Sequence, residues 1–360
     1  MQLPEDISEL YTFKGRFITV GRKNLPLLSL NGESLNKSYV MKTISKEGKS
    51  LSHKNRTPET DILLSIGHEN IVQVLTTSTD DMYDYLVFEK LSGNLRRYHI
   101  FKDMHFESDE SYSYLSQIAS ALTYLHEDEK IIHRDIKPEN MLIDFNNKHG
   151  EFFSIKLCDF GFSVRVNNVS KRDKLIGTLD FISPECIGVS FVSSITNDVW
   201  ALGCCYYEWV TGTGPFYKLY DKDTYKAIVS EEADYTHCND DERFLLKQML
   251  MKNPKTRITA KLLDTMLNKS DNNKDESQAL FCTFEWYTRA QKYESHGFEK
   301  FEDIWNICHL DDCQDQENFE LEKDGRVSFR SGEWIVFPHN SGSLNATFLK
   351  FCKEKCREKC

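Results

Sequence analysis

The sequence has no long apolar run and no excess of positive charge. None of its apolar stretches approaches the roughly 20 residues that a membrane-spanning helix needs, so we expect no membrane span. The first residues contain neither a basic nor an apolar segment, and Gln2 stands where N-myristoylation requires glycine, so we expect neither a signal peptide nor that lipid anchor. The formal net charge of −11 argues against nucleic acid or an anionic membrane surface as the main partner.

The cysteines form no recognisable disulfide framework. Their number, eleven, is odd, and most are scattered through apolar surroundings, where reduced thiols are expected. We therefore expect an intracellular protein, cytoplasmic or nuclear. The chain has 360 residues, of which 40% are hydrophobic and 28% charged, so it is long enough for two domains or for one two-lobed domain with an extra module.

Two short motifs carry the chemistry. Residues 133–140 read His-Arg-Asp-Ile-Lys-Pro-Glu-Asn, and a strand-like segment after them ends at residues 157–161, Leu-Cys-Asp-Phe-Gly. Phosphoryl transfer needs a base for the attacking hydroxyl, cations, and oxygen ligands for Mg²⁺, and the two motifs contain all of these residue types. Their order and spacing resemble those of the eukaryotic protein kinases of the serine/threonine type.

The resemblance implies a role for each polar residue of the two motifs. Asp135 would accept the proton of the substrate hydroxyl, and Lys137 would lie beside the transferred phosphate. Asn140 and Asp159 would bind Mg²⁺, which bridges Asp159 to the phosphates of ATP. His133 has the side chain of a general base, but the family gives that role to the aspartate, so we expect His133 to be structural.

Residues 11–91 are expected to form a β-rich nucleotide lobe. The segment Tyr-Val-Met-Lys that ends at Lys42 resembles the kinase strand whose lysine reaches the α- and β-phosphates of ATP. Val40 would then lie against the adenine. The polar stretch 31–38 before this strand is expected to be a loop.

The glycine-rich loop of the kinases is represented incompletely. Such a loop needs glycines so that backbone N–H groups can approach phosphate oxygens. Here Gly15 remains, while Phe13 and Ile18 stand where two further glycines are expected. Gly15 and Val20 are assigned to ATP binding by this resemblance, although a plain β-hairpin would have the same pattern.

A helix is expected to begin directly after Thr57 and to carry the carboxylate partner of the lysine. Thr57 suits the N-cap and Pro58 the first helical position. Residues 68–72, His-Glu-Asn-Ile-Val, resemble a kinase connection that identifies Glu59 as this partner. The alternative is that Glu59 is an ordinary first-turn acid favoured by the helix dipole.

The resemblance to the kinases also implies contacts with ATP from the segment between the lobes and from the surface beneath the adenine. Glu89 and Leu91 would belong to the hinge, and Leu142 would lie under the adenine. Phe88 would close the back of the adenine pocket.

Residues 92–267 are expected to form a mainly helical lobe. Apolar residues at helical spacing predict a long buried helix over 111–126, directly before the first motif. By resemblance, Asp198 would hold the backbone of that motif, and Glu185 would form a buried ion pair with Arg257. These three residues are therefore assigned structural roles.

Residues 177–185 resemble the substrate-docking segment of serine/threonine kinases, most of all the Aurora and calcium/calmodulin-dependent groups. Thr178 and Lys137 together favour serine or threonine as the acceptor. Glu139 is a candidate reader of a basic residue in the substrate. The usual phosphorylation site of the segment is occupied by Lys174, so we expect activation not to depend on phosphorylation at that position.

The C-terminal part reads as a separate module after a polar linker at 268–277. Residues 278–360 are too aromatic for a disordered tail, and residues 319–329 alternate around an Asp-Gly turn that predicts a β-hairpin. A third strand is expected at 334–337. Cys352, Cys356 and Cys360 recur on an expected lysine-rich terminal helix, where incidental thiols are favoured over a zinc or redox site.

The sequence therefore predicts an α+β, bilobal protein kinase fold over residues 11–267, with a small C-terminal α/β accessory module. The expected function is transfer of the γ-phosphoryl group of ATP, with Mg²⁺, to a Ser/Thr hydroxyl of a protein substrate. The alternative is a weakly active pseudokinase that serves as a scaffold and binds a partner through the C-terminal module. The incomplete glycine-rich loop favours the alternative, and the intact charged residues favour the kinase.

Overall fold

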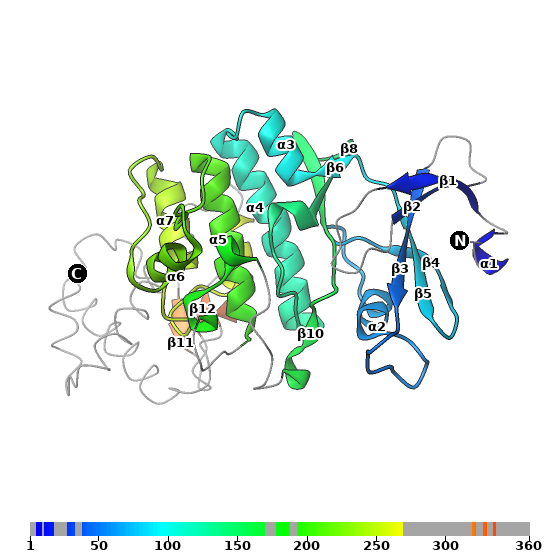
Figure 1. Ribbon diagram of the computed structural model, residues 1–360. Coiled ribbons are helices and arrows are strands. Elements are labelled where there is room, and N and C mark those ends of the chain that lie inside the picture. The colour runs from blue at the N-terminus through cyan, green and yellow to red at the C-terminus, as the bar shows by residue number, and fades with distance from the viewer. Residues whose placement is uncertain are drawn as a thin grey trace, which may run out of the picture. The chain divides into compact units, whose positions relative to one another are not determined.

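Figure 1 shows the computed structural model of the chain. The structure describes residues 5–8, 11–17, 27–32, 38–169, 178–187, 193–268, 319–321, 327–329 and 334–335. The chain divides into two compact units, Met1–Leu267 and Asn268–Cys360.

The first unit begins with a short helix, α1 (Glu5–Ser8), and a five-stranded antiparallel sheet of order β1-β2-β3-β5-β4. Its strands are β1 (Tyr11–Phe17), β2 (Leu27–Gly32), β3 (Ser38–Ser45), β4 (Val74–Thr79) and β5 (Tyr83–Glu89). The predicted loop over 31–38 is wrong at both ends, because Asn31 pairs with Ser38 in the β2–β3 ladder. This pairing satisfies backbone groups that a loop would leave to water.

The two faces of the sheet differ in character because side chains alternate along each strand. On one face Met41, Tyr85 and Val87 pack with Ile7 of α1 in a small apolar core. The residues that alternate with Met41, Tyr85 and Val87 lie on the other face. Lys42 is one of them, and this face contacts α2 through the Lys42–Glu59 hydrogen bond. One face of β3 is therefore purely structural, and the other supplies charged groups.

Helix α2 (Pro58–Ser65) confirms the predicted start. Thr57 is the N-cap, its side chain accepts a hydrogen bond from the backbone N–H of Thr60, and Pro58 occupies the first turn. Because these signals are local, the helix begins where the sequence indicates. Glu59 consequently lies in the first turn of α2.

The rest of the first unit is mainly helical (Figure 1). Its helices are α3 (Leu95–Phe101), α4 (Ser108–Thr123), α5 (Ile195–Thr211), α6 (Asp221–Ser230), α7 (Asp240–Met249) and α8 (Ala260–Leu267). Helix α4 contacts α5 and α8, and its apolar face is fully buried. The helix predicted over 111–126 begins three residues earlier and ends in a π-helical turn, Tyr124–Asp128, which buries Leu125 and His126.

Short strands join the motifs to this helical part. Strands β6 (Gly93–Asn94), β8 (Met141–His149) and β9 (Phe152–Leu157) form one small sheet, and β7 (Ile131–Ile132) pairs with β10 (Val164–Arg165). The first motif thus lies between β7 and β8, and the second follows the end of β9. The two motifs are brought together because β8 and β9 form an antiparallel hairpin.

The second unit contains a small antiparallel sheet. Its strands are β11 (Phe319–Leu321), β12 (Val327–Phe329) and β13 (Trp334–Ile335), in that order. They lie within the segments in which the sequence predicts a hairpin and a third strand. The cysteine row at 352–360 lies outside the described residues.

Five cysteines lie in the described part of the chain, and all five are free thiols. Four are buried, as expected, whereas Cys158 is half-buried. Among the described helices, none is both long and apolar enough to cross a membrane.

Candidate active site

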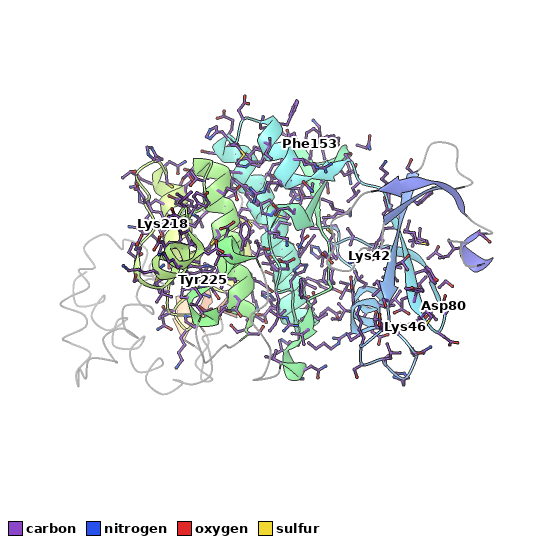
Figure 2. All side chains as sticks on the ribbon, viewed as in Figure 1. Lys42, Lys46, Asp80, Phe153, Lys218 and Tyr225 are labelled. Carbon is purple, nitrogen blue, oxygen red and sulfur yellow. The ribbon has the colours of Figure 1, made fainter. Side chains whose placement is uncertain are left out.

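Lys42 is the centre of a three-residue charged group. Its Nζ lies 2.6 Å from Glu59 Oε1 and 2.8 Å from Asp159 Oδ1. Strand β3 supplies the lysine, α2 the first carboxylate, and the turn after β9 the second; Figure 2 labels the lysine. Burial alone would lower the pKa of Lys42, but the two carboxylates outweigh burial and hold this pKa above its usual range. The lysine is therefore a permanent cation.

Asp159 adopts a left-handed backbone conformation, with φ of 63°, which is uncommon for a non-glycine residue. Its side chain remains 44% exposed. Burial would raise the pKa of Asp159, but the Lys42 ammonium outweighs it and lowers this pKa, so the carboxylate is ionised at neutral pH. A Cβ at Gly161 would lie 3.3 Å from Asp159 Oδ1 and 3.4 Å from Glu59 Oε2, so glycine permits this close approach.

Asp135 is the centre of a second polar group, on the loop between β7 and β8. Its Oδ2 accepts hydrogen bonds from Asn140 Nδ2 at 2.9 Å and pairs with Lys137 Nζ at 2.8 Å. The hydroxyl of Thr178 lies 3.4 Å from Asp135 Oδ1 and accepts a hydrogen bond from Lys137 Nζ at 3.1 Å. Only 5% of Asp135 is exposed. Asp135 therefore contacts all three of the other sequence-predicted residues, Lys137, Asn140 and Thr178.

His133 lies beneath the site and is fully buried. Its ring packs edge-on against Phe160, with centroids 4.8 Å apart, and its Nε2 is 3.1 Å from the carbonyl oxygen of Cys158. Burial lowers the pKa of His133, so the imidazole is neutral at neutral pH. These contacts are those of a packing residue that joins the two motifs.

Asp198 of α5 accepts hydrogen bonds from the backbone of the first motif. Its Oδ2 receives the N–H of His133 at 2.8 Å, and its Oδ1 receives the N–H of Arg134 at 2.9 Å. The ring of His126, which the π-helical turn carries, is a third partner at 2.9 Å. Burial would raise the pKa of Asp198, but the two histidines, His126 foremost, outweigh it and keep this pKa low. The carboxylate therefore holds the loop that carries Asp135.

Glu185 and Arg257 form a bidentate pair. The two guanidinium nitrogens lie 2.6 and 2.9 Å from the two carboxylate oxygens, and the arginine side chain is fully buried. Asn197 Nδ2 donates to the same carboxylate at 2.7 Å. The pair joins the segment after Thr178 to α5 and to the segment before α8.

Glu139 already has a basic partner within the chain. Its carboxylate lies 2.8 Å from Nε of Arg96 on α3, and the same guanidinium pairs with the buried carboxylate of Glu208 on α5. One guanidinium thus pairs with two carboxylates beside the loop that carries Asp135, and the three side chains together keep a net negative charge. No motif in the sequence points to Arg96 or Glu208, which lie 112 residues apart in the chain.

The residues assigned to ATP binding are described in part. Val40 lies half-buried in β3, opposite Phe88, and Leu142 lies half-buried in β8. Glu89 ends β5 and is exposed, and Leu91 follows it. The backbone of Gly15 follows a β-bulge in β1. Val20 and the segment around Lys174 lie outside the described residues.

A family model for the protein kinase domain matches residues 30–267. The chain belongs to the protein kinase family. This match covers both charged groups, the strand of Lys42 and the two motifs. The sheet followed by helices in the first unit agrees with the mixed helix and sheet content of a protein kinase domain.

The kinase domain is similar to the Aurora kinases. It is 38% identical to the Aurora kinase of Eremothecium gossypii over 204 residues, which cover 56% of this chain and 53% of that protein. It is 34% identical to Aurora kinase A-A of Xenopus laevis over 204 residues, which cover 56% of this chain and 48% of that protein. The chain thus spans about half the length of these relatives.

The similarity extends to another group of kinases. The cAMP-dependent protein kinase catalytic subunit of Dictyostelium discoideum is 32% identical over 293 residues, which cover 80% of this chain and 40% of that protein. The similarity is therefore not confined to the Aurora kinases but includes a second named kind of protein kinase.

Proposed function

We propose that this chain is a serine/threonine protein kinase, which transfers the γ-phosphoryl group of ATP to a hydroxyl of a protein substrate in the presence of Mg²⁺. The observation that carries the proposal is the simultaneous pairing of Lys42 with Glu59, at 2.6 Å, and with Asp159, at 2.8 Å. In protein kinases such a lysine must be paired with the helix glutamate, and the metal-binding aspartate must be in place, before phosphoryl transfer proceeds.

The donor set at the site fits Mg²⁺ and the phosphates of ATP. Mg²⁺ prefers oxygen ligands and is usually held by one or two carboxylates together with substrate phosphates. Asp159 offers an ionised, 44% exposed carboxylate. Asn140 directs its amide nitrogen to Asp135, which turns its amide oxygen away from that residue. Bound there, the metal would neutralise the charge that develops on the phosphoryl group.

Asp135 is proposed as the acceptor of the proton of the substrate hydroxyl. Lys137 and Asn140 bind Oδ2 of its carboxylate, whereas Oδ1 lies 3.4 Å from the hydroxyl of Thr178. Oδ1 is therefore the carboxylate oxygen that faces a hydroxyl group, and it is the oxygen proposed to accept the proton of the substrate. The ammonium of Lys137, which pairs with Asp135, is proposed to stabilise the negative charge of the phosphoryl group during transfer.

The substrate is proposed to be a protein with a serine or threonine acceptor, as the Lys137–Thr178 contact and the similarity to serine/threonine kinases support. Glu139 is 42% exposed and is proposed to contact a basic residue of the substrate, because its partner Arg96 is shared with Glu208 and the three side chains keep a net negative charge. We also propose the division of the chain into the kinase domain at 11–267, with lobes at 11–91 and 92–267, a linker at 268–277, and an accessory module at 278–360 that binds a partner.

The test is phosphate transfer from Mg-ATP to a generic basic protein by the wild type and by Asp135→Asn. Removal of a general base is expected to lower the rate by at least about 100-fold. Asp109→Asn is the matched control, because Asp109 is an exposed acid at the start of α4 and its substitution should leave the rate unchanged. Equal rates for the wild type and Asp135→Asn would contradict the role of Asp135. Absence of transfer from the wild type, with ATP binding retained in a thermal-shift assay, would favour the pseudokinase scaffold.

A further inference from the structure

Asp84, the second residue of β5, is a carboxylate with no exposure to solvent. Its Oδ2 accepts hydrogen bonds from the backbone N–H of Thr57 at 2.8 Å and from the hydroxyl of Thr60 at 2.7 Å. Its Oδ1 accepts a hydrogen bond from the hydroxyl of Thr79, on the neighbouring strand β4, at 2.6 Å. Burial would raise the pKa of Asp84, but these three donors outweigh burial and lower it, so the carboxylate is charged at neutral pH.

Two of the three donors flank the residue that pairs with Lys42. Thr57 is the N-cap of α2, Thr60 is in its first turn, and Glu59 lies between them. The two threonine hydroxyls also lie 2.8 Å apart, so the cap, the first turn and the carboxylate form one connected network. Since α2 begins at Pro58, only one helical residue precedes Glu59, and no earlier turn of this helix fixes its position.

A buried lysine balances the charge of Asp84 from the side of the sheet. Lys46 Nζ donates to the hydroxyl of Thr79 at 2.7 Å and lies 3.5 Å from Asp84 Oδ1. It also donates to the carbonyl oxygen of Asp80, and Figure 2 labels both Lys46 and Asp80 at the same end of the sheet. A buried charge is tolerated only when it is paired and hydrogen-bonded, and Lys46 supplies the counter-charge that the Asp84 carboxylate needs.

The other end of α2 has separate attachments. The hydroxyl of Ser65 accepts a hydrogen bond from Arg165 Nη2 at 2.9 Å, and the N–H of Gly67 donates to the hydroxyl of Tyr124 at 3.0 Å. These contacts lie two turns of helix away from Glu59. The network of Asp84 is therefore the attachment nearest to the glutamate.

We propose that Asp84 is a positioning residue for phosphoryl transfer: it holds the first turn of α2 on β5 and so keeps Glu59 within hydrogen-bonding distance of Lys42. This inference rests on the proposed function for its effect on catalysis. Its structural part, the attachment of α2 to β5, can be measured without any catalytic activity.

The experiment compares two isosteric substitutions. Each removes one threonine hydroxyl that donates a hydrogen bond to the Asp84 carboxylate. Thr60→Val removes the hydrogen bond from α2, and Thr79→Val removes the one from β4. We expect kcat/KM for Mg-ATP to fall about tenfold in Thr60→Val, the size of effect that one lost hydrogen bond to a buried charge produces, and to change by less than about twofold in Thr79→Val. Thr60→Ser keeps the hydroxyl and is expected to restore the wild-type value.

Hydrogen–deuterium exchange of the same full-length proteins provides the second measurement. Amide exchange in residues 58–65 is expected to be faster in Thr60→Val than in the wild type, and unchanged in Thr79→Val. If both valine variants alter exchange and kinetics equally, or if Thr60→Val alters neither, Asp84 does not position α2 and the inference is wrong. If the wild type transfers no phosphate, the proposed function fails, while the exchange of α2 still decides whether Asp84 holds the helix.

Discussion

Two buried aspartates hold two different parts of the site, and they do so by the same means. Asp84 on β5 holds the first turn of α2, and Asp198 on α5 holds the loop that carries Asp135. Each is almost completely inaccessible to solvent, and each carboxylate accepts three hydrogen bonds. In both, the donors outweigh burial and lower the pKa of the aspartate. A buried carboxylate is an effective support because it accepts several donors at once from segments distant in the chain.

The two aspartates differ in their counter-charge. Asp84 is accompanied by the ammonium of Lys46, whereas the partners of Asp198 are two backbone N–H groups and the ring of His126. Asp198 also belongs to a motif that could be recognised from the sequence, whereas Asp84 belongs to no recognised motif. One support of the site therefore belongs to a motif that resembles the family pattern, while the other consists of pairs that become visible only in the folded structure.

The largest effect is expected for Asp198→Ala. This change leaves three donors without an acceptor in the interior, and each such donor costs about 1–3 kcal/mol. We expect the free energy of unfolding to fall by roughly 3–5 kcal/mol and phosphate transfer to be lost. Urea unfolding monitored by circular dichroism measures the first quantity. A loss of less than about 1 kcal/mol would show that Asp198 does not support the loop in the way the hydrogen bonds indicate.

An intermediate effect is expected when both charges of the Asp84 group are replaced. Asp84→Leu alone leaves the Lys46 ammonium buried and unpaired, which costs roughly 3–5 kcal/mol. The double variant Asp84→Leu/Lys46→Met removes both charges and is expected to recover most of that stability. Its α2 should nevertheless exchange faster than in the wild type, because Thr57 and Thr60 have lost their acceptor.

Thermal unfolding and hydrogen–deuterium exchange separate these two results. A double variant that regains both stability and slow exchange of α2 would show that packing alone holds the helix. Asp84 would then not support α2 as Asp198 supports the loop that carries Asp135.

The smallest effect is expected in the acid dependence of stability. The pKa of Asp84 is lower in the folded protein than its ordinary value, so its contribution is fully present above the unfolded-state pKa of about 3.9 and is lost as pH falls through the folded value. Asp84→Asn lacks this titration. We therefore expect its melting temperature to fall less steeply than that of the wild type below about pH 5. Parallel curves for the two proteins would contradict the lowered pKa.

Parts of the fold could be predicted from the sequence because their signals are local. Thr57 and Pro58 mark the start of α2 through capping and a fixed backbone angle. The helix over 111–126 was predicted by its apolar spacing, although its ends were misplaced by three residues. The π-helical turn was missed, because it depends on the burial of Leu125 and His126 against other elements.

The site was predictable to the extent that its residues fall within short motifs. Asp135, Lys137 and Asn140 lie on one loop, so their contact follows from chain continuity. The Arg96–Glu208 pair was missed because nothing in the sequence connects two residues so far apart. Asp84 did leave a signal, a carboxylate in an otherwise apolar strand, Tyr-Asp-Tyr-Leu-Val-Phe, which indicates a buried polar network without naming its partners.

The sequence by itself determined the family, the order of strands and helices around the two motifs, and the residue types available for phosphoryl transfer. Tertiary structure alone decided that Arg96 would pair with Glu139, that His126 would join the support of Asp198, and that Asp84 would accept hydrogen bonds from Thr57 and Thr60. The physical reason is the range of the interactions. Capping and motif spacing act within a few residues. The partner of a buried charge instead depends on which helices and strands pack together in the folded chain.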